Sequence, residues 1–259
     1  MHTRDKIISP LIAFLQSIPQ INAVWEGGSA AWGRIDNWSD IDLQVDVADD
    51  LVDDIMWRTE NFLEQTFGID LKFPIQPSVW PGVTQTFFRL KDTSPFLLLD
   101  FAVIKTSAKS KFLEQEIHGN AIVHFDRAGI TQGIHANTTE LFKKLEERLP
   151  MLKTRFEIFQ ILVEKELKRG NAIEAFNFYL GFTVQPIIEA LRIVHCPYHW
   201  NFHSRYIHYE LPKKWVEKIQ PLYFVADADE LKQKWKQAAE LFADAIQEAE
   251  NSFKKTAYV

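Results

Sequence analysis

The residues best suited to chemistry lie in the stretch 27–42, which reads GGSAAWGRIDNWSDID. Asp40 and Asp42 stand two positions apart where an alternating apolar and polar segment begins. In a strand, residues two apart point to the same face, with Cα atoms about 6.5–7 Å apart. Two such carboxylates repel each other unless a positive charge lies between them, and Mg²⁺ is the divalent cation that most often meets hard oxygen ligands. The pair predicts a magnesium site.

A glycine-rich turn precedes this pair and suits a phosphate group. Gly27 and Gly28 allow the backbone to approach a ligand closely, and Ser29 begins a helix or a tight turn with free N–H groups and a hydroxyl. We expect Gly28 and Ser29 to bind phosphates. Arg34 lies between the turn and the acids. Its position is compatible with contact to a triphosphate and equally with a solvated loop arginine. A phosphate site beside a metal site is typical of phosphoryl or nucleotidyl transfer.

A third acid is expected from residues 97–104, LLLDFAVI, where Asp100 is the only carboxylate in an apolar strand. A buried unpaired carboxylate is costly, so this side chain should face a cavity, a metal or a cation. Three acids on two neighbouring strands are able to hold two metal ions about 3.5–4 Å apart. Asp36 and Asp46 are predicted to be surface residues.

The first half of the chain has the rhythm of an α/β region that would position these acids. In residues 41–47 the apolar side chains alternate with Asp42, Gln44 and Asp46, so the two sets should face opposite sides of a strand. Helices are expected at 4–17, with Pro10 opposing a straight one, and at 49–66, ending at Gly68. Further strands are expected at 21–26, 69–75, 84–90, 97–104 and 121–125.

The second half has helical periodicity. Three helix starts carry a capping-box spacing, in the pairs Asn137/Glu140, Asn171/Glu174 and Asp227/Glu230. The last helix has one apolar stripe. Its members are Leu231, Trp235, Ala238, Phe242, Ala245 and Ala249.

Glycine and proline set the other expected breaks in this half. Gly170 should end a helix that starts near residue 151, and Pro186 should kink or split the segment 172–194. The change of rhythm near 127–137 divides the chain into domains 1–130 and 131–259. The expected class is α+β, a mixed sheet with helices followed by a helical bundle.

Together, Gly28-Ser29, the step to Asp40-Ile41-Asp42, and Asp100 on a later strand resemble the polymerase-β-like nucleotidyltransferases. The small bacterial branch that includes the antibiotic nucleotidyltransferases is similar in style. Residues 118–129 resemble the closing strand of that family, which often ends in a Gly-x-x-x-x-x-x-Asp turn. The second half resembles the appended helical bundle of the family only in type.

The resemblance implies a magnesium-dependent transfer of a nucleoside monophosphate, AMP first, from ATP or another NTP to an acceptor hydroxyl, with release of pyrophosphate. Asp40 and Asp42 would hold Mg²⁺, and Asp100 would be a metal ligand and the base. A net charge of −6 and an aromatic-rich helical half favour a small hydroxylated acceptor, such as an aminoglycoside-like antibiotic, over a nucleic acid. The alternatives are adenylylation of a protein or RNA partner, as in toxin–antitoxin systems, and a non-catalytic nucleotide-binding protein.

Residues 192–208 allow two other interpretations. His195, His199 and His203 with Cys196 could bind zinc if they lay on one helix, but Pro197 opposes a continuous helix there. Aromatic-rich packing or a wall of the substrate site is the favoured interpretation of this segment. Arg192 with His199 loosely fits the pattern of a helical ribonuclease. The helical acids Glu164, Glu166, Glu174 and Glu189 are candidate bases by position, but solvated helix faces explain them more simply.

Composition sets the expected compartment. Cys196 is the single cysteine, which excludes an internal disulfide and fits a reducing environment. The N-terminal apolar run is broken by Pro10 and no small-residue cleavage site follows, so no signal peptide is expected. No stretch approaches the roughly 20 apolar residues of a membrane span. The sequence predicts a cytoplasmic protein.

Overall fold

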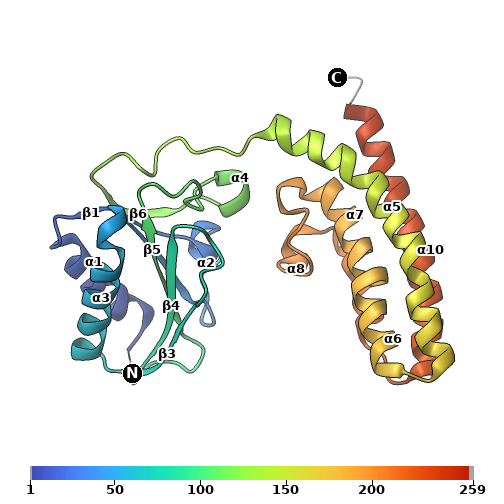
Figure 1. Cartoon of the computed structure of the whole chain (residues 1–259), viewed down its shortest axis with the longest axis horizontal. Coiled ribbons are helices and arrows are strands. Elements are labelled where there is room, and N and C mark those ends of the chain that lie inside the picture. Colours follow the sequence, from blue (N-terminus) through green and yellow to red (C-terminus); the bar gives the residue numbers. More distant parts are fainter. Residues whose placement is uncertain (1, 257–259) are drawn as a thin grey trace. The chain divides into compact units, whose positions relative to one another are not determined.

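The protein is described here by a computed structural model that covers residues 2–256. The chain forms two compact units, residues 1–136 and 137–259. Figure 1 shows the first unit as the part labelled from α1 to β6 and the second as the part labelled from α5 to α10. The predicted α+β class is confirmed, because a mixed sheet with helices precedes a helical region.

The first unit contains a six-stranded sheet in the order β3-β4-β5-β2-β1-β6. Strands β2 and β5 are parallel neighbours at its centre, and every other neighbouring pair is antiparallel. The strands are β1 Ile21–Glu26, β2 Ile41–Val47, β3 Ile69–Pro74, β4 Val83–Leu90, β5 Leu99–Lys105 and β6 Ile122–Asp126. All six predicted strands are confirmed, with ends shifted by two residues at most.

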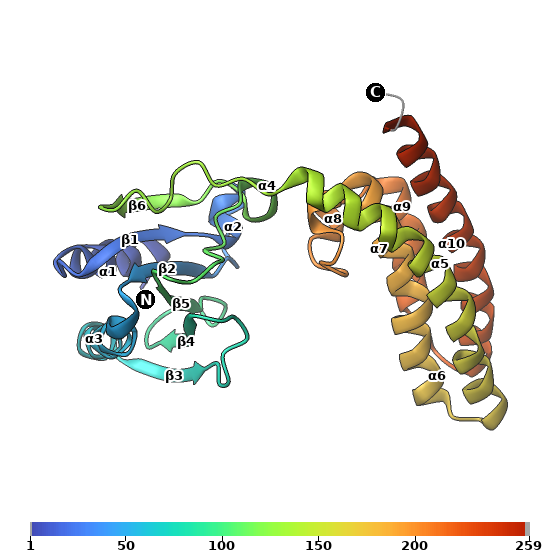
Figure 2. The same ribbon diagram turned by 45° about the horizontal axis from the view of Figure 1, so that its top comes forward.

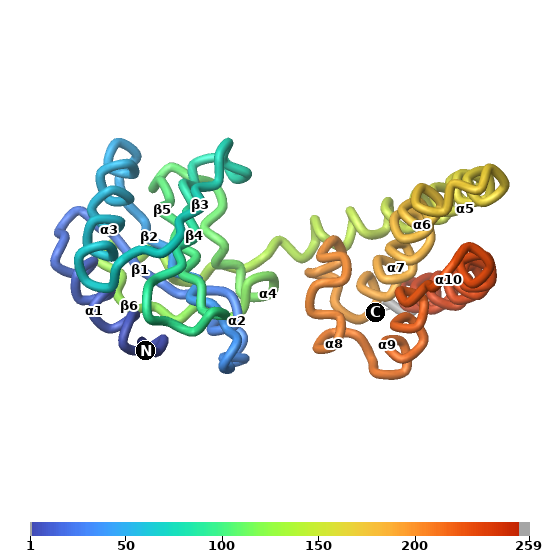
Figure 3. The backbone as a smooth tube through the Cα atoms, turned by 90° about the horizontal axis from the view of Figure 1, so that it is seen from below, coloured from blue at the N-terminus to red at the C-terminus, as the bar shows by residue number. Residues whose placement is uncertain are grey.

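Helices α1 (Arg4–Gln16) and α3 (Val52–Thr66) cover one face of this sheet. Figures 1 and 3 show both helices along the same side of the strands. The four apolar residues of β2 are fully buried in the core beneath these helices, as the alternation predicts. They are Ile41, Leu43, Val45 and Val47.

The opposite face of the sheet carries the polar residues of β2 and a smaller core. That core joins Trp25 of β1 and Ala102 of β5 to Leu113, which lies in the connection between β5 and β6. Two short helices, α2 (Gly28–Ala31) and α4 (Gln115–His118), also belong to connections of this unit. One face of the sheet is therefore closed by helices, while the other presents the acids.

The second unit is helical throughout. Figure 2 shows α5 and α10 running alongside each other, and both pack on α7. The helices are α5 Thr138–Arg169, α6 Ala172–Tyr179, α7 Gln185–His195, α8 Ile207–Glu210, α9 Lys213–Ile219 and α10 Ala228–Thr256. Within residues 2–256, none of the helices combines the length and the apolar character that crossing a bilayer requires.

Two of the three predicted helix caps are confirmed. The Asn137 side chain accepts the N–H of Glu140 at 3.1 Å, and the Asp227 side chain accepts that of Glu230 at 2.8 Å. Asn171 makes no such bond, and its side-chain amide donates to Glu166 at 2.7 Å.

The other predicted breaks in this unit have mixed outcomes. Gly170 ends α5 with φ +77°, and a π-helix at Leu180–Val184 separates α6 from α7, whose first turn holds Pro186. The predicted start near residue 151 is wrong: α5 begins at Thr138 and passes through Pro150. The buried stripe that includes Leu149 and Leu152 continues across this proline, and that packing offsets the lost backbone hydrogen bond.

Candidate active site on the open face of the sheet

Asp42 and Asp100 are direct register partners on the parallel strands β2 and β5. Both side chains lie on the face opposite α1 and α3, because their neighbours Ile41, Leu43 and Phe101 are all buried in the helix-covered core. Neighbouring strands are about 4.8 Å apart, so two aspartates in register hold their carboxylates within reach of one small ion. The chain thus places two of its predicted acids side by side.

Asp40 lies just before β2 and joins the same group. One of its carboxylate oxygens accepts the N–H of Leu98 at 3.2 Å, and the N–H of Ile41 donates to the Leu98 carbonyl at 2.9 Å. Asp40 therefore links the beginnings of the two parallel strands, β2 and β5. Its negative charge acts on Asp100, whose pKa it helps to raise.

Burial raises the pKa of Asp100 above the ordinary aspartate range, and repulsion from Asp40 adds to the effect. Gln85 of β4 opposes it, since its side-chain amide donates to both carboxylate oxygens at 2.7 and 2.9 Å and favours the charged form. A carboxylate that is costly to ionise is suited to accepting a proton. The sequence reasoning missed Gln85, although a glutamine within the strand VTQTFFRL was a usable signal.

The glycine turn is built against Asp42. The N–H of Gly27 donates to the Asp42 carbonyl at 2.9 Å, and Gly28 has φ +54°. A Cβ at Gly28 would lie 1.8 Å from Oδ2 of Asp42, so no other residue fits there without displacing that carboxylate. The turn and the acid pair, which were separate motifs in the sequence, form one structure.

Residue Gly119 supports this turn from the other side. It has φ +80°, and a Cβ there would meet the Ala31 carbonyl oxygen at 2.7 Å. The next residue, Asn120, donates its N–H to the same oxygen at 2.9 Å. The predicted Gly-x-x-x-x-x-x-Asp turn ends at Asp126, whose carboxylate accepts backbone N–H groups from three following residues. The segment 119–126 therefore packs on α2 and pairs with β1.

Two polar atoms near the turn are buried without a hydrogen-bond partner. They are Oγ of Ser29 and Oε1 of Gln44. Gln44 lies two residues beyond Asp42 on the same face, and its amide approaches the Cβ position of Gly27 within 3.4 Å. Buried polar atoms are normally satisfied, so a hydroxyl donor and an amide acceptor left over here indicate a site that a polar ligand completes.

The predicted position of Asp46 is wrong. Its side chain is fully buried, pairs with Lys111 at 2.6 Å and accepts the Thr106 hydroxyl at 2.7 Å and the Asn22 amide at 2.9 Å. Buried carboxylates need such partners, and Lys111 comes from a loop that the strand pattern does not reveal. Asp36 is exposed, as predicted, and organises its loop by accepting the Trp38 N–H at 3.0 Å.

Behind the turn, Glu26 at the end of β1 is almost fully buried and pairs with Arg4 of α1. Desolvation lowers the pKa of Arg4, and attraction to nearby acids, Asp42 among them, opposes that shift. Burial and the charge of Arg4 also lower the pKa of His124, which lies 3.7 Å from Glu26. None of these three residues was among the sequence candidates.

Arg34, by contrast, was a sequence candidate. Its guanidinium carbon lies 5.3 Å from the centroid of the Trp32 ring, and its backbone N–H donates to the Ser29 carbonyl at 2.9 Å.

The donor set suits a hard divalent cation, because it consists of three carboxylates on one sheet face with two in register. As they stand, however, the side chains do not converge: across residues 2–256 no three acidic, histidine or cysteine side chains gather closely enough to hold a metal ion. Asp100 is turned to Gln85, and one oxygen of Asp40 is engaged by Leu98. What the backbone does provide is the register of Asp42 with Asp100 on neighbouring strands, with Asp40 two residues before Asp42.

The histidine motif of the second unit forms no metal site. His199 is buried and its ring nitrogen lies 2.7 Å from Glu210, while His195 pairs with Glu248 at 2.9 Å. As expected from Pro197, helix α7 ends at His195 and a separate turn follows. Arg192 is fully buried, so the ribonuclease pattern does not lie on a surface.

Most of the candidate helical bases are already paired. Glu189 receives two hydrogen bonds from Arg148, at 2.5 and 3.1 Å, and Glu164 pairs with Lys168 at 2.7 Å. Glu166 accepts from Asn171 at the end of α5. Glu174 is exposed in the first turn of α6.

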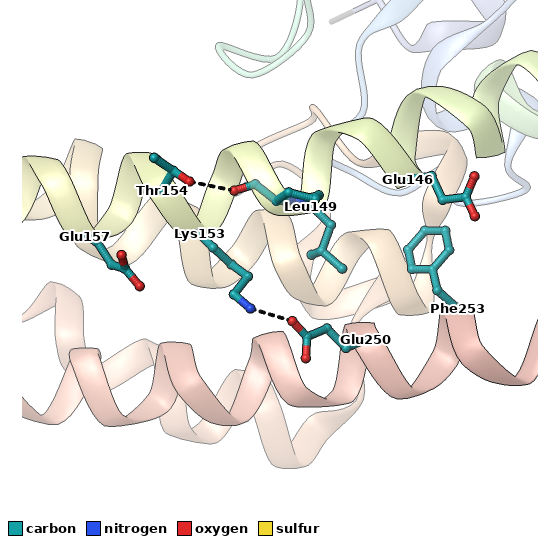
Figure 4. A pocket seen from close by; sticks show the side chains of 8 residues that line it. Glu146, Leu149, Lys153, Thr154, Glu157, Glu250 and Phe253 are labelled. Atoms are coloured by element: carbon teal, nitrogen blue, oxygen red, sulfur yellow. Dashed lines mark hydrogen bonds and ion pairs between the residues drawn. The ribbon is translucent and has the colours of Figure 1, made fainter.

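A groove of about 460 Å³ lies between α5 and α10 in the second unit (Figure 4). Lys153 and Glu250 pair across it at 2.6 Å, and Glu157 and Phe253 also line it. Its walls combine carboxylates with apolar surface, which suits a ligand that is both cationic and partly apolar.

Comparison with known proteins adds little to these observations. No protein-family model matches the chain, and no curated protein matches it. Among solved structures, the chain is similar to an aminoglycoside 6-adenyltransferase from Bacillus subtilis, over 98% of this chain and 92% of that one, with 12% identity and a TM-score of 0.39.

Proposed function

We propose that this protein is a magnesium-dependent nucleotidyltransferase that transfers AMP from ATP, or a nucleoside monophosphate from another NTP, to a hydroxyl of a small-molecule acceptor. The observation that carries the proposal is the in-register pair Asp42 and Asp100, with the turn at Gly28 built against Asp42. Residues 1–130 would form the catalytic domain, and residues 131–259 would bind the acceptor or a partner.

In this proposal Asp40, Asp42 and Asp100 would hold Mg²⁺, which would neutralise charge on the triphosphate. Backbone N–H groups at Gly28 and Ser29, together with the Ser29 hydroxyl, would bind the β- and γ-phosphates, with Arg34 as a further phosphate contact. The unpartnered Ser29 hydroxyl supports this role.

Asp100 would accept the proton of the acceptor hydroxyl. The acceptor oxygen then forms a bond to the α-phosphorus, the bond from that phosphorus to the β-phosphate bridging oxygen breaks, and pyrophosphate leaves. The burial that raises the Asp100 pKa and the Gln85 amide that orients it support this role. Positioning and charge neutralisation would supply most of the rate.

The acceptor class is proposed from charge. The net charge of −6 disfavours a nucleic-acid acceptor, and the groove between α5 and α10 combines carboxylates with apolar surface. Both features favour a small hydroxylated and cationic molecule of the aminoglycoside type. Adenylylation of a protein or RNA partner is the alternative outcome.

The test is pyrophosphate release from each of the common NTPs with Mg²⁺, against a panel of aminoglycosides, other hydroxylated molecules, tRNA and cell extract. Asp42→Asn should abolish release and leave the thermal unfolding curve intact. Asp36→Asn is the matched control, since that aspartate is exposed and lies outside the acid group. Turnover of Asp42→Asn at the wild-type rate would refute the mechanism.

A further inference from the structure

The second unit contains a buried charge network that the proposed reaction does not use. Arg192 on α7 is fully buried and pairs with Glu210, whose other oxygen lies 2.7 Å from the His199 ring. Buried ionic groups cost several kcal/mol each in desolvation and are retained only where their partners satisfy them.

What the network does hold is the backbone of residues 199–210, which we call the Arg192 loop. Nε of Arg192 donates to the His203 carbonyl at 2.7 Å, and Nη2 donates to the Arg205 carbonyl. His203 and Tyr206 have φ of +53° and +59°, a conformation that non-glycine residues rarely adopt. Such strain persists where surrounding structure enforces it, and it is concentrated at ligand sites.

The strained loop presents Arg205 to solvent. Its guanidinium carbon lies 5.7 Å from the ring centroid of Phe202 and 5.2 Å from that of Tyr206, and Nη2 donates to the Tyr206 hydroxyl at 3.1 Å. These contacts fix the guanidinium without neutralising it. In the part of the chain that the structure describes, no carboxylate pairs with Arg205, whereas Arg148, Arg169 and Arg192 each have one.

We propose that the Arg192 loop is a phosphate-binding site, with Arg205 as its principal ligand. A guanidinium of fixed orientation offers two parallel N–H donors to a phosphate, and stacking on rings lowers the entropy lost on binding. His203 and His208 are also exposed in the Arg192 loop, and their rings are further possible N–H donors. The phosphate would come either from a free small molecule or from an RNA backbone, and the experiment separates these sources. The proposal does not depend on transfer activity.

The test uses the full chain in EDTA, so that the predicted magnesium site stays empty. Inorganic phosphate, pyrophosphate and a short single-stranded RNA are titrated while the Arg Nε–Hε NMR resonances are followed, and acetate serves as the control anion. Arg205→Gln should weaken binding about tenfold to hundredfold, the size of a charge-assisted hydrogen bond, with Arg205→Lys in between. Arg155→Gln is the matched control, because Arg155 also stacks on a ring, that of Phe182, but lies on a regular helix.

A response to phosphate or pyrophosphate that disappears in Arg205→Gln would establish a site for a free phosphate. A response to RNA alone would show that the site binds the phosphates of an RNA backbone. The proposal fails if no probe binds at millimolar concentration, if acetate binds as well, or if Arg155→Gln weakens binding as much as Arg205→Gln. If Arg205→Gln does not fold, the wild-type Arg205 resonance decides, since a true ligand must shift it.

Discussion

Gly28 and Asp42 occupy one space, because a Cβ at residue 28 would lie 1.8 Å from Oδ2 of Asp42. The absence of a side chain at Gly28 therefore determines where the Asp42 carboxylate is able to lie. The turn and the acid pair should fail together when either is changed.

Gly28→Ala should therefore reduce kcat/KM by more than a hundredfold, since a shift of about 1 Å in a catalytic group is enough for such a loss. It should also lower the free energy of unfolding by about 1–3 kcal/mol, as a side chain at φ +54° is strained. Pyrophosphate-release kinetics and urea unfolding measure the two effects.

Gly33→Ala is the matched control for that change. Gly33 also has positive φ, +63°, but nothing lies within 4 Å of its Cβ position. It should share the backbone strain and keep most of the activity. Equal loss of activity in both variants would mean that strain in the loop, and not the contact with Asp42, controls the site.

Asp100 should make the protein less stable as pH rises. Its pKa is raised in the folded state, so between the unfolded value of about 3.9 and the folded value the native protein binds more protons than the unfolded chain, and stability falls with pH in that interval. Asp100→Asn removes this titration. Urea unfolding in EDTA should give a stability advantage of Asp100→Asn over wild type that grows as the pH rises above about 4 and levels off once Asp100 is ionised in the folded protein. An advantage that is independent of pH would show that Asp100 titrates normally.

Gln85→Leu should lower kcat about tenfold to hundredfold with KM for the NTP unchanged, because the variant removes the hydrogen bonds that orient and charge Asp100, worth about 1.5–3 kcal/mol. Thr84→Val, on the same strand, is the control and should retain activity. Steady-state kinetics with saturating acceptor check this, and a change confined to KM would assign Gln85 to substrate binding instead.

Lys111→Met should destabilise the first unit by about 3–5 kcal/mol, since it leaves the fully buried Asp46 without its cation. The double variant with Asp46→Asn should recover part of that loss. Lys109→Met, at an exposed position of the same loop, should change stability by less than about 0.5 kcal/mol. Thermal unfolding of these three variants and of Asp46→Asn alone measures the order, and additive effects of the two single changes would argue against the ion pair.

Much of the fold was predictable because local patterns and tertiary packing agree. The strict alternation in residues 41–47 fixed both the strand and its buried face, and the stripe of α10 is buried as expected apart from Trp235, which is half-buried and donates to Gln160 at 2.7 Å. The predicted start of α5 was wrong because of Pro150. The hydrogen bond that a proline removes can be inferred from the sequence, whereas the packing that offsets its loss cannot.

The site was predictable only in part. Asp40 and Asp42 are local to one strand, so their shared face follows from spacing, whereas the register that sets Asp42 opposite Asp100 is a property of the assembled sheet. Gln85 and Lys111 come from other parts of the chain, and no regular sequence spacing relates them to the acids that they contact. Asp46 continues the polar alternation of Asp42. The sequence alone did not reveal that its side chain is buried and paired with a lysine from a loop.

The parallel pairing of β2 with β5 has a consequence for how the protein matures. Helix α3 and the hairpin of β3 and β4 separate these strands in the chain, so Asp42 and Asp100 become neighbours only after that whole crossover is complete. During synthesis Asp100 cannot take its place opposite Asp42 until β5 has emerged from the ribosome. On the proposed function, a chain truncated before Leu99 would keep the glycine turn, Asp40 and Asp42 but would lack Asp100, one of the three acids proposed to hold Mg²⁺.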